Sequence, residues 1–245
     1  LTSLPQKFDP KAIAAKGFRV YCPDQRGAGW TVADDPRVER QTRLRDLVAL
    51  YDALQIERAH LVSHDLGSIT AIQLTYENPE RVLTAVQLAV PPFFMTFRPG
   101  LLPGFRHLPA FIWHRPAASL RGIFSEDYVA HPMSDDTIEA HLAPMHLPAI
   151  DGAVRTLTRG LVLPEAIRMA RGVYRRRRLT VPTLVVFGRG DHPWSEELLG
   201  RACRNPQRYA DRVEFAYVDD AKHFITDDAP AAVAELALDW FDRAA

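Results

Sequence analysis

Five short apolar runs alternate with stretches of helical periodicity along this chain. The runs are strand-like in length and composition, and they cover residues 18–22, 59–63, 81–89, 183–187 and 212–218. The clearest helical stripe predicts an amphipathic helix over residues 41–54, and further helices are predicted at 195–204 and 229–241. Strands that alternate with helices at this spacing predict βαβ units and a mostly parallel sheet flanked by helices.

The pattern changes between residues 93 and 178. Prolines and aromatic residues recur at its start, helical segments follow at 135–141, 150–161 and 164–174, and no strand-like run appears. We therefore expect residues 93–178 to form a helical cap, or lid, inserted over the edge of the sheet. Residues 1–92 and 179–245 would form the core below it.

One polar residue stands where the second apolar run stops and a helix starts at once. The chain there reads Ser63-His64-Asp65-Leu66-Gly67, with a small residue two positions before and two positions after Asp65. This spacing is typical of a nucleophile elbow, in which strand and helix backbones pass close together. A serine usually occupies the turn, so an aspartate there would change the chemistry. The alternative is that Asp65 only caps the helix.

Two further polar residues follow later strand-like runs, Asp191 after 183–187 and His223 after 212–218. Parallel strands end at one edge of a sheet, so we expect both residues to lie near Asp65. The order nucleophile, acid, histidine is that of a hydrolase triad, in which the acid holds the histidine in one tautomer. Other acids near His223 could orient it instead of Asp191: Asp219, Asp220, Asp227 and Asp228.

A carboxylate nucleophile restricts the substrate, although it needs no activating base because it is ionised at neutral pH. Its attack on an ester would give an anhydride, whereas its attack on the sp³ carbon of an epoxide or alkyl halide gives an alkyl ester. Water activated by His223 would then hydrolyse that ester, and the backbone N–H of Leu66 would stabilise the oxyanion. We expect a small, apolar-leaning organic substrate and water, with no cofactor and no metal.

Four motifs together resemble the α/β-hydrolase superfamily, in particular its epoxide hydrolase and haloalkane dehalogenase branch. They are Pro23-Asp24-Gln25-Arg26-Gly27-Ala28-Gly29-Trp30, the elbow, Phe187-Gly188-Arg189-Gly190-Asp191 and Lys222-His223-Phe224. The resemblance covers residues 18–90 and 180–243, and it implies the α/β-hydrolase fold with Asp65, Asp191 and His223 as the triad. The pair His64-Asp65 is closer to epoxide hydrolases than to esterases. The alternatives are a haloalkane dehalogenase-like hydrolase and a non-catalytic member of the fold that binds a small ligand.

The chain departs from the family pattern in two regions. The family's His-Gly-x-Pro segment, which supplies a second oxyanion N–H, has no counterpart before Leu4-Pro5, so we expect the core to lack its first strands. Thr158 stands where the family has a cap tyrosine that protonates the opening epoxide. Tyr128 is a candidate replacement, with ordinary packing as the alternative. Trp113 and Trp194 are candidates for lining a substrate pocket or for core packing.

Charge and composition add little to this hypothesis. The chain has 245 residues and equal numbers of acidic and basic side chains, so no nucleic-acid or membrane partner is expected. The run from Arg175 to Arg178 is the local exception, either a solvated loop or an anion-binding patch. Membrane-spanning and signal sequences are not recognised, and two unpaired cysteines favour the cytoplasm, with Cys22 expected to be buried. The oligomeric state stays open.

Five histidines fall in the predicted cap. Their spacing shows no metal-ligand pattern, so we expect surface or packing roles for all of them. They are His107, His114, His131, His141 and His146.

Overall fold

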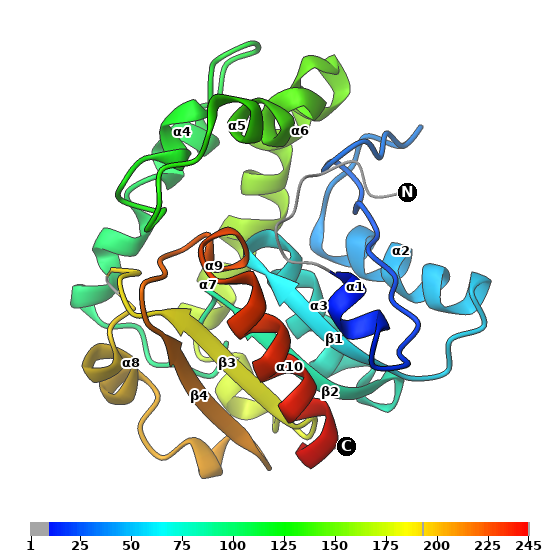
Figure 1. Cartoon of the computed structure of the whole chain (residues 1–245), viewed down its shortest axis with the longest axis vertical. Coiled ribbons are helices and arrows are strands. Elements are labelled where there is room, and N and C mark those ends of the chain that lie inside the picture. The colour runs from blue at the N-terminus through cyan, green and yellow to red at the C-terminus, as the bar shows by residue number, and fades with distance from the viewer. Residues whose placement is uncertain (1–9, 193, 245) are drawn as a thin grey trace.

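The computed structural model describes residues 10–192 and 194–244, and the described strands form one parallel sheet (Figure 1). In their order across the sheet they are β1 (Ala59–His64), β2 (Val82–Leu88), β3 (Thr183–Gly188) and β4 (Val213–Val218). Each neighbouring pair is parallel. The predicted parallel sheet is confirmed, and these strands fall on four of the five predicted runs.

Helices cover both faces of the sheet. On one face lie α2 (Arg40–Ala53), α3 (Asp65–Glu77) and α8 (Glu196–Ala202), and on the other lie α1 (Pro10–Ala14), α9 (Ile225–Asp228) and α10 (Pro230–Ala244). The central strands β2 and β3 are therefore buried from both sides, which explains why they read as continuous apolar runs. Val185 points into one core, and its neighbour Val186 points into the other.

The predicted strand over residues 18–22 is wrong, and so is the predicted burial of Cys22, which is exposed. Phe18 packs edge-on against His60 of β1 and Phe241 of α10, which anchors the segment beside the sheet. Tyr21, which would lie on the opposite face of a strand from Phe18, is exposed. Side-chain anchoring does not supply the backbone pairing that defines a strand, so an apolar run alone was insufficient.

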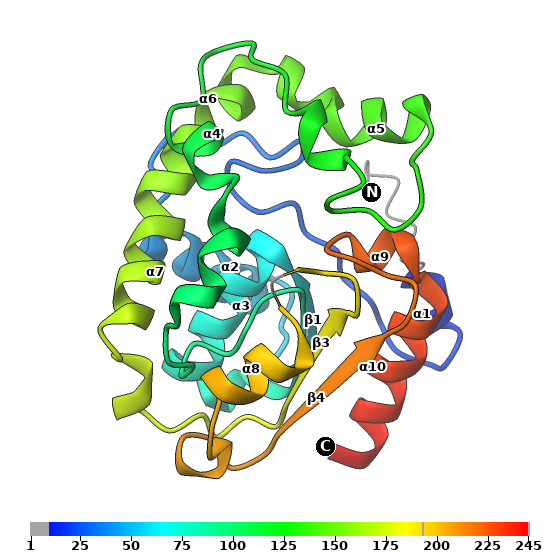
Figure 2. The same cartoon turned by 90° about the vertical axis from the view of Figure 1, so that its left-hand side faces the viewer.

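The segment between β2 and β3 contains helices and no strand, all of it within the described residues. Its helices are α4 (Leu108–Ile112), α5 (Asp135–Leu142), α6 (Pro148–Leu157) and α7 (Leu163–Ala170). A π-helical turn, Thr158–Val162, joins the last two. Figures 1 and 2 show α4, α5 and α6 beyond the C-terminal ends of the strands. We propose that residues 93–178 act as a cap and call them the cap segment.

Two expectations concern the ends and the surface of the chain. The expected loss of the first core strands refers to the chain at and before Leu4-Pro5, which lies outside the described residues. In the part that is described, no helix combines the length and hydropathy needed to cross a membrane.

Candidate active site

The junction of β1 and α3 is a sharp elbow, and Asp65 occupies it. His64 is still extended, whereas Asp65 has a φ of 45° and is already the first residue of α3. A left-handed conformation is costly for a residue with a Cβ, and it is typical of strained functional sites. The glycine at the second small position is not sterically required, because a methyl group on Gly67 would meet only Gln25 Nε2, at 3.9 Å.

His223 lies between two carboxylates. Its Nδ1 is 3.3 Å from Asp191 Oδ2, and its Nε2 is 3.8 Å from Asp65 Oδ1. Asp191 is buried at the end of β3, whereas 49% of the Asp65 side chain remains accessible. The buried carboxylate can therefore hold the imidazole, while the accessible one can meet a substrate. The structure brings together all three residues of the predicted triad.

The other acids near His223 have different partners. Asp219 pairs with Arg189, and Asp220 lies 3.1 Å from His131 Nε2. Asp227 lies 3.3 Å from His141 Nε2, while Asp228 accepts hydrogen bonds from backbone N–H groups of Ala130 and Lys222. Asp191 is therefore the acid that the geometry places against the His223 ring.

A second histidine holds the loop that carries His223. His64 Nε2 is 2.8 Å from the backbone carbonyl oxygen of His223, and a carbonyl can only accept. Burial and the neighbouring His223 ring lower the pKa of His64, which keeps the imidazole neutral with its proton available for this bond. His64 thus joins the elbow directly to the histidine loop.

The site shifts the pKa values of Asp65 and His223 in opposite directions. Burial opposes charge on Asp65, but the imidazoles of His223 and His64 outweigh it and lower the pKa of this carboxyl. Burial also opposes charge on His223, yet its hydrogen bond to Asp191 and the Asp65 carboxylate raise the pKa of the imidazole. The carboxylate form of Asp65 is therefore favoured, and His223 gains basicity.

The backbone N–H of Leu66 is one of the groups that lower the pKa of the Asp65 carboxyl. This N–H belongs to the first turn of α3, where amide protons have no partner within the helix and stabilise negative charge. The predicted oxyanion donor therefore lies in the first helical turn, directly after the residue on which an oxyanion would form.

Tyr128 and His107 bring the cap segment against the triad. The Tyr128 ring lies edge-on to His223, with 6.2 Å between ring centroids, and its carbonyl accepts from the N–H of Phe224. Arg106 lies over the Tyr128 ring and donates through Nε to the phenolic oxygen at 3.2 Å. The candidate replacement tyrosine is thus next to the triad histidine.

The sequence did not identify His107 as a residue near the triad. The surface or packing role expected for it does not describe its position fully. Its ring contacts Tyr128 and Phe111 edge-on, and its buried Nδ1 has no hydrogen-bond partner among the described residues. Burial lowers the pKa of His107 despite the charge of Asp65, so the ring is neutral near pH 7. A lone histidine before Leu108 carries no sequence signal for this position.

The remaining candidates lie elsewhere. The Thr158 hydroxyl donates to the Val154 carbonyl oxygen within its own helix, at 2.8 Å, so its proton is already used. Trp113 is 66% exposed, and Trp194 is buried against Phe105 and Phe187. None of the contacts described for Thr158 and Trp113 reaches the triad, whereas the backbone N–H of Trp194 donates to the carbonyl oxygen of Asp191 at 2.8 Å. Of the two roles considered for Trp194, core packing is therefore the one that the structure supports.

The other cap histidines pair with acids. His114 and Asp151 form a buried pair with 2.6 Å between Nε2 and Oδ1, and His131 and His141 pair as described above. His146 Nε2 lies 3.4 Å from Glu139. These contacts agree with packing and surface roles.

Comparison with known proteins adds independent findings. The sequence profile described as the alpha/beta hydrolase family matches residues 6–236. The AB hydrolase superfamily protein YfhM of Bacillus subtilis is 25% identical over 94% of this chain and 82% of its own length. An epoxide hydrolase of Caballeronia sordidicola is 36% identical over 37% of this chain and 28% of its own length. The solved epoxide hydrolase CorEH superposes with a TM-score of 0.77, covering 96% of this chain and 85% of its own, at 21% identity.

Proposed function

This chain is a hydrolase enzyme that belongs to the alpha/beta hydrolase family and resembles its epoxide hydrolase branch, and on that premise we propose that it opens epoxides through a covalent ester on Asp65. The observation that carries the proposal is the identity of the elbow residue. It is an accessible carboxylate with an imidazole beside it, and that imidazole is held by a second, buried carboxylate.

In the first half-reaction, the Asp65 carboxylate attacks an epoxide carbon. A bond forms between that carbon and a carboxylate oxygen, while the bond from the same carbon to the epoxide oxygen breaks. The released oxygen takes a proton and becomes a hydroxyl group. The lowered pKa of Asp65, which the His223 and His64 imidazoles maintain against burial, keeps the nucleophile ionised.

Tyr128 and His107 are the groups that we propose for protonating the epoxide oxygen. Both extend from the cap segment, their rings contact each other, and the Tyr128 ring also contacts His223. The phenol is a donor, and neutral imidazole carries one N–H. This arrangement would replace the hydroxyl that Thr158 cannot offer.

In the second half-reaction, His223 takes a proton from water, and the resulting hydroxide attacks the ester carbonyl of Asp65. The tetrahedral oxyanion receives a hydrogen bond from the Leu66 N–H, an interaction whose loss typically costs about 2.7–4 kcal/mol. Collapse of this intermediate breaks the acyl–oxygen bond, and the leaving alkoxide takes the proton of the new acid, which releases the diol and restores the carboxylate. The proton on His223 then returns to the cap donor that lost one in the first half-reaction. Asp191 keeps the imidazole in the tautomer that leaves Nε2 free to accept.

Trapping of the ester tests this function. The variant His223→Gln should alkylate but not hydrolyse, so intact-protein mass spectrometry after incubation with styrene oxide should show an adduct of substrate mass on the Asp65 peptide. The variant Asp65→Asn with His223→Gln is the matched control and should show none.

The choice of substrate separates the alternatives. An adduct with an alkyl bromide and release of bromide, but no adduct with any epoxide tried, would replace the proposal by a dehalogenase. No adduct with either class would favour a member of the fold that only binds small ligands.

A further inference from the structure

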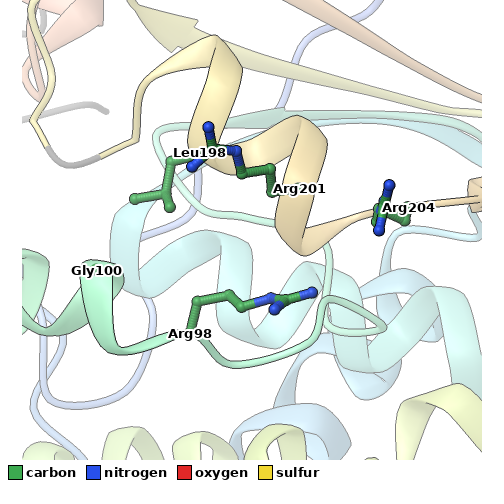
Figure 3. A pocket seen from close by; sticks show the side chains of 5 residues that line it. All are labelled: Arg98, Gly100, Leu198, Arg201 and Arg204. Atoms are coloured by element: carbon green, nitrogen blue, oxygen red, sulfur yellow. The ribbon is translucent and has the colours of Figure 1, made fainter.

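Two clefts whose lining includes none of the triad residues are built largely from arginine. The first has a volume of about 420 Å³ and lies between the start of the cap segment and α8 (Figure 3). Its lining residues are Arg98, Gly100, Leu198, Arg201 and Arg204. The second has a volume of about 270 Å³, and its lining residues are Arg171, Gly172, Arg175, Arg176, Arg208 and Tyr209.

Thr96 connects the two clefts. Its backbone N–H donates to the carbonyl oxygen of Ala202, at the end of α8, at 2.8 Å. Its hydroxyl accepts from Arg175 Nη1, in the second cleft, at 3.1 Å. The clefts are therefore neighbours, and together they include part of the run from Arg175 to Arg178 that the sequence marks as unusual. We call the seven arginines that line them the arginine surface.

Positive charge is not neutralised on this surface. Within the described residues, Arg201 pairs with Glu197, and no other arginine of the surface has a carboxylate at salt-bridge distance. Acidic side chains are also absent from the described lining of both clefts. Elsewhere arginines are commonly paired, for example Arg189 with Asp219 and Arg243 with Glu214. A chain of zero net charge thus concentrates unpaired cations in one region.

Helix ends give one physical reason for part of this cluster. Arg201 and Arg204 lie at the C-terminal end of α8, and Arg171 follows the end of α7, where cations offset the helix dipole. Arg98 lies at neither helix end. Figure 3 shows it reaching along the wall of the first cleft that faces α8, opposite Arg204. Helix stabilisation therefore does not account for Arg98.

We propose that the arginine surface binds a ligand with two or more phosphate groups. Guanidinium groups match phosphate oxygens with paired N–H donors, and no acid competes for them there. The first cleft has the size of a small-molecule site, and the second offers cations for a neighbouring phosphate. A bound anion would also relieve repulsion among the arginines. This ligand site is separate from the proposed epoxide chemistry.

Tripolyphosphate is the probe for a test by calorimetry and thermal unfolding. Titration should give saturable binding, and the unfolding midpoint should rise by roughly 5 °C at a concentration 100-fold above Kd. Sodium chloride at matched ionic strength should not reproduce this shift. The double variant Arg98→Gln with Arg204→Gln should weaken binding at least tenfold.

A matched double variant controls for charge. Arg115→Gln with Arg155→Gln removes two exposed cap arginines that line neither cleft, and it should bind tripolyphosphate as the parent does. Arg98→Lys keeps the charge but loses the paired donors, and it should bind more weakly than the parent. Equal losses in both double variants, or no saturable binding by the parent, would overturn the proposal.

Binding to lipid vesicles distinguishes the two possible sources of the phosphate, a lipid headgroup and a soluble ligand. Co-sedimentation with phosphatidic acid vesicles that tripolyphosphate displaces would assign the site to lipid headgroups, whereas binding of tripolyphosphate alone would assign it to a soluble ligand. If the protein binds a long oligonucleotide more tightly per phosphate group than it binds tripolyphosphate, the proposal of a small-ligand site is contradicted.

Discussion

His64 Nε2 donates to the carbonyl oxygen of His223 at 2.8 Å, so the residue before the elbow fixes the loop that carries the triad histidine. The two rings lie 5.4 Å apart, between centroids. Because His64 is joined directly to Asp65, this single bond couples the positions of the nucleophile and the base across 159 residues of sequence.

Loss of that bond should affect the second half-reaction most. In His64→Leu the His223 carbonyl loses its donor, which should reduce the free energy of unfolding by about 1 kcal/mol. Hydrolysis of the Asp65 ester should slow at least tenfold, because the base is displaced. Rapid-quench measurement of ester decay should show this loss, and His64→Gln should recover part of it. Equal ester decay in His64→Leu and the parent would contradict the role of His64.

Proton donation from the cap segment predicts that variants of the donor residues slow alkylation of Asp65 and not hydrolysis of the ester. Tyr128→Phe and His107→Leu should each slow alkylation of Asp65, by up to about 10²–10⁴-fold for the main donor. Decay of the ester already formed should change little, since no epoxide oxygen remains. Stopped-flow detection of alkylation separates the two steps. If neither variant slows alkylation, the donors lie elsewhere.

The raised pKa of His223 gives the reaction a pH dependence. Burial lowers this pKa, but the hydrogen bond to Asp191 and the Asp65 charge raise it above the usual 6.5. Only the neutral ring accepts a proton from water, so ester hydrolysis should increase as pH rises through the pKa that His223 has in the ester, where the hydrogen bond to Asp191 still raises it but the Asp65 charge is gone. The protonated ring also stabilises the folded state. This contribution is fully present below the pKa of His223 in the unfolded chain, and it is lost as pH rises through the higher pKa of His223 in the folded protein.

Asp191→Asn tests the cause of that shift. The variant should move the midpoint of the pH profile to lower pH, and its maximal rate should also fall, because the tautomer is no longer enforced. Turnover from pH 5 to 9 gives both quantities. A midpoint that stays in place would exclude Asp191 as the main cause.

The buried side chain of Arg43 predicts a substitution that stabilises the fold. It is only 3% exposed, and its Nε and Nη1 have no hydrogen-bond partner in the part of the chain that the structure describes. Burial lowers the pKa of Arg43 to about 10, against the charges of Asp46 and Asp65. Since an unpaired buried charge is costly, Arg43→Met should raise the free energy of unfolding by about 1–4 kcal/mol. Denaturant titration should show this gain, whereas a loss of stability would reveal an anionic partner.

Much of the fold could be predicted because its information is local. The strands β1 to β4 are apolar runs of suitable length, and α2 carries its own stripe, so each element forms where its pattern predicts. The proximity of Asp65, Asp191 and His223 could be predicted for a topological reason, since parallel strands bring the three residues to one edge of the sheet. The position of Asp65 also depends on a local signal, the strand-to-helix change around it.

The remaining features depend on distant partners. Residues 18–22 have the composition of a strand, but strand formation requires pairing that composition cannot guarantee. His107 gains its place from the path of the cap segment over the triad, which no spacing encodes. Thr158 is different, because its hydroxyl has a local partner, the carbonyl oxygen of Val154 four residues earlier.

Isotopic labelling tests the central claim most directly, namely that Asp65 forms the ester. The protein should be allowed many turnovers of an epoxide in H₂¹⁸O, then digested and analysed by mass spectrometry. Hydrolysis at the acyl carbon should place ¹⁸O in the Asp65 carboxylate, and the diol of a single turnover should carry unlabelled oxygen from that carboxylate. Label in the first diol with none in Asp65 would show direct attack by water and contradict the account.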